Sequence, residues 1–264
     1  MKLFRSLTCA LALLSIVTVA PAAGLDNAQW DGLLQRHVRL LDGGNATQVD
    51  YAGMLAERAQ LREYLAAIAA VKPKLFASWS KADQLALLIN AYNAWTVEFV
   101  LSGDPQIDSI KDLGSLFQSP WKQQFINLLG KTRSLDELEH QLIRGEHGYQ
   151  EPRVHFALNC ASIGCPALQA EAYSGATLEQ QLNDAQQHFL ADRSRNRLSG
   201  ESLQVSSIFK WYREDFELNG QSLADYLAAQ ANALGLTQAQ REQLLDGQIE
   251  IEFLDYDWRL NRTQ

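Results

Sequence analysis

The reactive side chains of this chain gather in residues 153–166 (RVHFALNCASIGCP). An apolar run contains His155 and Asn159 and leads into a short turn that carries Cys160 and Cys165. A cysteine thiolate with a histidine as its base is the pair that thiol-dependent hydrolases and acyl transferases use. The sequence therefore predicts a site centred on cysteine and histidine, with Cys165 or Cys160 as the nucleophile.

The identity of the base depends on how the backbone runs toward the cysteines. The apolar run over residues 154–159 predicts a β-strand that ends at the site. In a straight strand, side chains an odd number of residues apart point to opposite faces, so His155 and Cys160 would not meet. Cys165, beyond the turn, is the easier partner for His155. His140, on the helix expected before the strand, is the other candidate base.

A structural disulfide between Cys160 and Cys165 is the alternative interpretation. Both cysteines lie beyond the export signal that the first residues predict, so an exported chain would retain them. Oxidising compartments favour disulfide formation between two such cysteines. A disulfide that closes so short a loop would add about 2 kcal/mol at most to the free energy of unfolding. Its main effect would therefore be to fix the shape of the loop. It could also be redox-active, although the spacing is not the C-x-x-C of thioredoxin-like sites. A zinc site that adds His140 and His155 is disfavoured by the C-x₄-C spacing and by the oxidising compartment, and we expect no metal or cofactor.

Four further residues are candidates for orienting the site or binding a ligand. Asn90 and Asn93 share a face of an otherwise apolar helix, where buried amides need partners. They could bind backbone groups or the cysteine loop and lock the core, or one could orient a reacting group beside the thiol. Asn159 and Arg153 flank the cysteines and complete this set.

Two segments combine aromatic and acidic residues, 209–216 (FKWYREDF) and 256–258 (YDW). Helix packing explains such segments in most proteins. The alternative is the wall of a groove for an extended ligand, such as a peptide or a cell-wall glycan. Asp215 and Asp257 could also serve as the acid/base pair of a glycosidase, but the sequence does not fix their separation.

The elements that must position these residues are mostly helices. Apolar spacing, with capping residues at Asp26, Ser80, Ser134 and Thr177, predicts helices over residues 26–41, 54–71, 81–100, 134–144 and 177–191. Strands are expected over residues 124–129, 154–159 and 249–253, with a hairpin over 197–205. Strands and helices do not alternate regularly. We therefore expect an α+β fold, a helix-rich single domain with a small, mainly antiparallel sheet.

The first residues predict export. Lys2 and Arg5 precede an apolar stretch, and Ala20-Pro21-Ala22 offers small residues to a signal peptidase. We predict a signal peptide over residues 1–22, cleaved after Ala22, and a periplasmic or secreted product with no later membrane segment. The net charge of −8 argues against nucleic-acid binding, which requires clustered cations. No phosphate loop, serine elbow or H-E-x-x-H motif is present, which disfavours nucleotide and metalloprotease chemistry.

Five ordered motifs resemble the DUF547 family. They are DQLALLINAYNAW (83–95), SLDELEHQLIR (134–144), RVHFALNCASIGCPAL (153–168), SSIFKWYREDF (206–216) and YDWRLN (256–261). The resemblance covers residues 50–261 and leaves 23–49 as an N-terminal helical segment. It implies an exported bacterial member of that family and no particular reaction.

The leading hypothesis is an exported protein with a Cys/His-centred site at a strand end, acting as a thiol-dependent hydrolase or acyl transferase. The alternative is a non-catalytic binding or scaffold domain whose Cys160–Cys165 disulfide is structural. Whether the protein is an enzyme stays open at this point.

Overall fold

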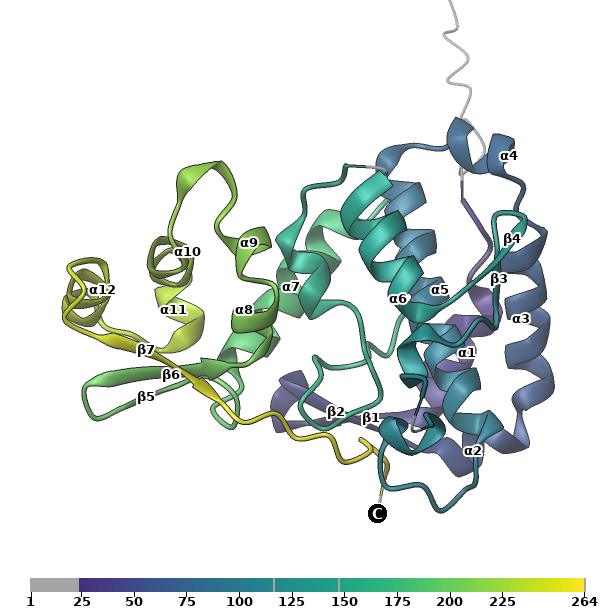
Figure 1. The fold of residues 1–264 in the computed structure, drawn as a ribbon, viewed down its shortest axis with the longest axis horizontal. Helices are drawn as coiled ribbons and strands as arrows, with labels where there is room; N and C mark the ends of the chain where they lie inside the picture. Colours follow the sequence, from purple (N-terminus) through teal and green to yellow (C-terminus); the bar gives the residue numbers. More distant parts are fainter. Residues whose placement is uncertain (1–23, 116, 147, 264) are drawn as a thin grey trace, which may run out of the picture.

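The computed structural model describes residues 24–115, 117–146 and 148–263. The predicted signal peptide and its cleavage site lie outside the described residues. Figure 1 shows two groups of elements side by side, a larger one from the first half of the chain and a smaller one from residues 197–254. Each group encloses its own cluster of buried apolar side chains. The prediction of a helix-rich α+β fold is confirmed.

Helix α5 (Lys81–Ser102) is the centre of the larger group. Its cap is the predicted one, because the Ser80 hydroxyl accepts a hydrogen bond from the Asp83 N–H at 3.1 Å. By length and composition this helix could cross a membrane, but 83% of its most apolar window is buried inside the protein. It is therefore the core helix that its nearly continuous apolar surface predicts.

The other helices of the larger group are mostly short. They are α1 (Ala28–His37), α2 (Tyr51–Ala56), α3 (Arg58–Ala70), α4 (Pro73–Ser78) and α6 (Leu135–Glu137). The helix expected to reach residue 41 ends at His37, where the chain becomes a strand. The helix expected over 54–71 is two helices that meet at Glu57. The predicted cap at Ser134 is confirmed, since Ser134 and Glu137 form a capping box.

The sheets are small, and among the strands of the described residues one pair is parallel. The antiparallel pairs are β1 (Val38–Leu41) with β2 (Ala46–Val49), β3 (Ile126–Leu128) with β4 (Lys131–Arg133), and β5 (Arg197–Ser199) with β6 (Ser202–Ser206). β7 (Glu250–Leu254) lies parallel to β6. The predicted hairpin and last strand are thus confirmed.

The smaller group consists of this mixed sheet and short helices. Its helices are α8 (Ile208–Trp211), α9 (Arg213–Phe216), α10 (Leu223–Ala229), α11 (Ala231–Leu234) and α12 (Gln238–Leu245), with α7 (Leu178–Ala191) beside them. Short 3₁₀ segments lie at Asp42–Gly44, Ile110–Leu113, Pro120–Lys122 and Leu218–Gly220. Phe156 joins the smaller group's core, with its ring centroid 5.1 Å from that of Phe189.

The strand predicted over residues 154–159 is wrong. Pro152–Phe156 form a 3₁₀ helix, and irregular backbone follows it. Pro152 occupies the first turn, and the Glu151 carboxylate accepts the Arg153 N–H at 3.1 Å. Val154 packs in the larger core and Phe156 in the smaller one. The alternating apolar residues therefore enter two different cores, whereas the sequence analysis placed them on one face of a sheet.

Candidate functional site

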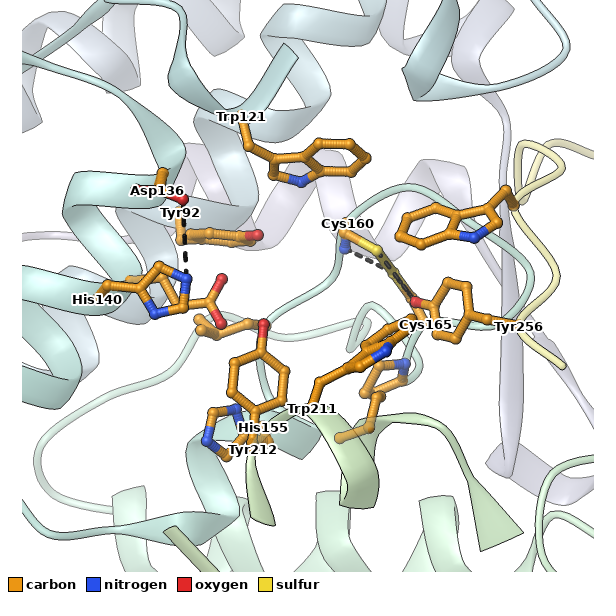
Figure 2. A pocket seen from close by; sticks show the side chains of 15 residues that line it. Tyr92, Trp121, Asp136, His140, His155, Cys160, Cys165, Trp211, Tyr212 and Tyr256 are labelled. Carbon is orange, nitrogen blue, oxygen red and sulfur yellow. Dashed lines mark hydrogen bonds and ion pairs between the residues drawn. A yellow bond between two sulfur atoms is a disulfide. The ribbon is translucent and has the colours of Figure 1, made fainter. Parts of the chain in front are cut away.

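A pocket of about 180 Å³ is lined by residues from both groups of elements and from the cysteine segment. Aromatic rings form most of its wall (Figure 2). They are Tyr92, Trp121, Trp211, Tyr212, Tyr256 and Trp258. Both cysteines, two histidines and two acids complete the lining together with three apolar residues. Apolar walls with a few converging polar groups are typical of small-ligand sites.

One wall of the pocket contains the Cys160–Cys165 disulfide. Cys165 is 2% exposed, whereas Cys160 is partly exposed. The Tyr256 hydroxyl lies 3.1 Å from Cys165 Sγ and 3.2 Å from Cys160 Sγ. In this state both sulfurs are bonded, so neither is a thiolate. We call Cys160, Cys165 and Tyr256 the disulfide wall.

Buried amides fix the disulfide wall to α5. The Asn93 side chain accepts the Asn159 N–H at 2.8 Å and donates to the Ala157 carbonyl at 2.9 Å. The Asn159 side chain donates to the Pro166 carbonyl at 2.7 Å and accepts the Ala161 N–H at 3.0 Å. Ala161 is held in the left-handed region at φ 64°, which costs a non-glycine residue about 1–2 kcal/mol. The amides thus hold a strained loop in one shape.

Two of the sequence-predicted residues lie away from the pocket. Asn90 binds the backbone of Tyr173, donating to its carbonyl at 2.8 Å and accepting its N–H at 2.9 Å. Arg153 pairs with Glu151 and Glu179, and these ion pairs tie the 3₁₀ helix to α7. Neither Asn90 nor Arg153 lines the pocket.

The wall opposite the disulfide is acidic. α6 continues into a π-helix (Leu138–Glu146), a widened turn common at functional sites. Glu139, 7% exposed, faces the pocket from this helix, and the phenols of Tyr92 and Tyr212 hydrogen-bond to it. Burial first, and then the Glu139 charge, raise the pKa of both phenols, so both remain donors at neutral pH. Within the described part of the chain, no cationic side chain forms an ion pair with Glu139.

His155 lines the same side of the pocket and is bound to a carboxylate. Its Nε2 is 2.6 Å from Asp215 Oδ2, and its ring stacks on Tyr212 with centroids 3.9 Å apart. Arg144 Nε binds the same Asp215 oxygen at 2.6 Å. Burial opposes ionisation of Asp215, but hydrogen bonds from His155 and Arg144 outweigh it and hold the Asp215 pKa well below its usual range. His155 Nε2 is therefore already bound to Asp215 in this structure.

His140, the other candidate base, is at the rim of the pocket. Its Nδ1 lies 2.8 Å from Arg144 Nη1, and its Nε2 lies 3.8 Å from Asp136 Oδ1. Figure 2 shows both histidines on the side of the pocket away from the disulfide. No hydrogen bond joins a cysteine sulfur to a histidine among the residues described here. We call Glu139, Asp136, His140 and His155 the acidic wall.

The acid pair and the zinc alternative receive no support from the geometry. Asp257 binds Arg259 at 2.5 Å and Asp215 binds Arg144, and neither acid lines the pocket. Over residues 24–115, 117–146 and 148–263, no three His, Cys, Asp or Glu side chains are grouped to hold a metal ion.

Sequence reasoning missed Glu139, Asp136 and Trp121. Glu139 had a detectable signal, because it follows Leu138 and lies three residues before Leu142 on the buried side of its helix. A carboxylate at such a position needs a reason. The aromatic groove alternative did anticipate four of the lining residues, Trp211, Tyr212, Tyr256 and Trp258.

Comparisons with known proteins gave one match. No curated protein and no solved structure matches the chain. Residues 76–190 match the family model described as "Protein of unknown function, DUF547", a range that includes α5, the π-helix and the cysteine segment. Residues 76–190 of this chain are therefore similar to the DUF547 family.

Proposed function

We propose that this protein is an exported binding domain whose aromatic pocket holds an ammonium group of a cell-wall peptide or glycan. The observation that carries the proposal is Glu139, a buried carboxylate that faces the pocket without a cationic partner from the described residues. A buried charge is costly unless it is paired. The two phenols satisfy it only in part, and a cation in the pocket would complete its pairing.

The aromatic wall supports a cationic ligand independently. Ring faces attract ammonium groups, by about 0.5–2 kcal/mol per contact depending on desolvation. The protein already makes one such contact at this place, since Lys111 Nζ lies 3.7 Å from the centroid of Trp258, which lines the pocket. Asp136 adds negative charge at the rim. Ring faces and carboxylates thus favour the same class of ligand.

Peptides and glycans share this chemistry. A peptide offers the amines of its side chains and its N-terminus, and a glycan offers amino sugars. The predicted signal peptide and the disulfide fit an exported protein that meets cell-wall material. The pocket volume suits one such group of a longer ligand.

The thiol-dependent hydrolase favoured by the sequence has less support. Its nucleophile would first have to be released from the disulfide, and its predicted base His155 is bound to Asp215. A binding domain whose disulfide shapes one wall of the pocket needs neither change.

A matched pair of probes tests the proposal. Choline and 3,3-dimethylbutan-1-ol have the same shape and differ in the positive charge. Titration followed by tryptophan fluorescence should show choline binding at least about tenfold tighter, the ratio that about 1.4 kcal/mol of cation recognition gives. Equal affinity for the two probes would contradict the proposal.

Further ligands distinguish the two sources of the amine. A short lysine-containing peptide and its acetylated form make one arm, and a glucosamine oligomer and its N-acetylated form make the other. The expected result is tighter binding of the free amine in one arm than of its acetylated control. Binding of the acetylated forms alone would overturn the assignment of the ammonium group.

A further inference from the structure

The Cys160–Cys165 disulfide is asymmetric in its surroundings. Both cysteines line the pocket, but Cys160 is partly exposed, whereas Cys165 is 2% exposed. Thiol–disulfide exchange begins when a thiolate attacks the accessible sulfur of a disulfide, and the other sulfur leaves as a thiolate. The geometry of access therefore assigns Cys160 as the sulfur that is attacked.

Hydrogen-bond donors gather at the sulfur that would leave. The Cys160 N–H donates to Cys165 Sγ at 2.8 Å, and the Tyr256 O–H donates to the same atom at 3.1 Å. Burial raises the Tyr256 pKa, so its hydroxyl keeps its proton and remains a donor at neutral pH. Hydrogen bonds to an ionised acceptor are roughly twice as strong as neutral ones, so both donors favour a Cys165 thiolate over a Cys165 in the disulfide.

We propose that the Cys160–Cys165 disulfide is a thiol-exchange site, which reacts with a low-molecular-weight or protein thiol that enters the aromatic pocket. The incoming thiolate forms a bond to Cys160 Sγ while the Cys160–Cys165 bond breaks, and the electron pair of that bond passes to Cys165 Sγ. The products are a mixed disulfide on Cys160 and a Cys165 thiolate. A second thiolate then attacks the mixed disulfide, which leaves two reduced cysteines and a disulfide between the two external thiols.

The surrounding structure can keep the loop in place while the bond is open. The Ile163 N–H donates to the Arg259 carbonyl at 2.8 Å, and the Gly164 N–H donates to the Asp257 carbonyl at 2.9 Å. With the Asn93 and Asn159 amides, these bonds hold the loop on both sides of the cysteines. The two sulfurs would therefore remain close, and the disulfide could re-form without refolding of the domain. This inference does not depend on the ammonium ligand.

The experiment uses the full folded protein and glutathione as the thiol. The protein is mixed with reduced glutathione at neutral pH, quenched with acid and alkylated, and the mixed disulfide is located by peptide mass spectrometry. We expect glutathione on Cys160 and alkylated Cys165. Glutathione mainly on Cys165, or a disulfide that glutathione reduces only after unfolding in denaturant, would overturn the proposal.

Tyr256→Phe tests the donor, and Tyr226→Phe is its matched control. Tyr226 is another buried tyrosine whose hydroxyl binds Gln186 at 3.3 Å in the smaller group. Loss of one hydrogen bond to a thiolate should slow reduction of the Tyr256→Phe protein by about tenfold. The Tyr226→Phe protein should react at the wild-type rate. Equal rates for all three folded proteins would contradict the role of Tyr256, and the mapped position of glutathione on the wild-type protein tests the exchange site without any variant.

Discussion

The two walls of the pocket are stabilised in different ways. On the disulfide wall, the amides of Asn93 and Asn159 are each paired with two backbone groups. On the acidic wall, His155 is paired with Asp215, which Arg144 also binds, whereas Glu139 receives hydrogen bonds from two phenols and, among the described residues, forms no ion pair. Fully paired buried polar groups specify one structure. An incompletely paired charge in a cleft indicates where a ligand would bind.

Asn93→Ala should have the largest effect on stability. The substitution leaves the Asn159 N–H and the Ala157 carbonyl without their partners in a buried position. We expect a loss of about 3–4 kcal/mol in the free energy of unfolding, measured in urea. Asn90→Ala should cost a similar amount through Tyr173, but only Asn93→Ala should also weaken choline binding. If both variants left choline binding unchanged, the amides would not support the pocket.

Asp215→Asn tests the carboxylate that holds His155 of the acidic wall. It leaves Arg144 and His155 facing a neutral amide, and because Asp215 is partly exposed we expect about 2–3 kcal/mol of destabilisation at pH 7. The pKa of Asp215 is lowered in the folded protein, so its contribution is present above the unfolded pKa of about 4 and is lost as the pH falls toward the folded value. Urea unfolding at pH 7 and pH 3 should show the difference between variant and wild type shrinking in acid. A difference in unfolding free energy that is larger at pH 3 than at pH 7 would contradict the stabilising role of the ionised Asp215.

Removing the disulfide should matter less than removing the amides. The Cys160→Ala/Cys165→Ala protein loses the cross-link of a very short loop, which is worth about 2 kcal/mol. Its unfolding free energy, compared with that of Asn93→Ala, ranks the two supports of the disulfide wall directly. A cost well above that of Asn93→Ala would make the disulfide the main support.

Lys111→Met should have the smallest effect of these substitutions. Unlike Asn93→Ala, it should strengthen choline binding. Lys111 places its own ammonium group on Trp258 and competes with a ligand cation for that ring. We expect choline affinity to rise about two- to threefold, or roughly 0.5 kcal/mol. A fall in affinity would indicate that Lys111 helps to bind the ligand.

Local signals in the sequence predicted the caps at Ser80 and Ser134, the core helix and the hairpin, whereas the cap predicted at Thr177 makes no side-chain hydrogen bond to the backbone. Ser80 and Ser134 have the side chains that such caps need, and the structure uses both. The strand predicted over residues 154–159 is wrong, because apolar alternation does not reveal that Val154 and Phe156 enter two different cores. Burial of Glu139 among aromatic rings from distant segments depends on tertiary packing, which spacing along the chain cannot supply.

The stability of wild type and Glu139→Gln, each measured with and without choline, tests the central claim most directly. Glutamine keeps the size of the side chain and removes its charge, so the variant without choline should be at least as stable as wild type. Choline should stabilise the wild-type protein by mass action and should stabilise Glu139→Gln far less. Equal stabilisation of both proteins by choline would contradict the account, because the Glu139 carboxylate would then have no part in recognising the cation.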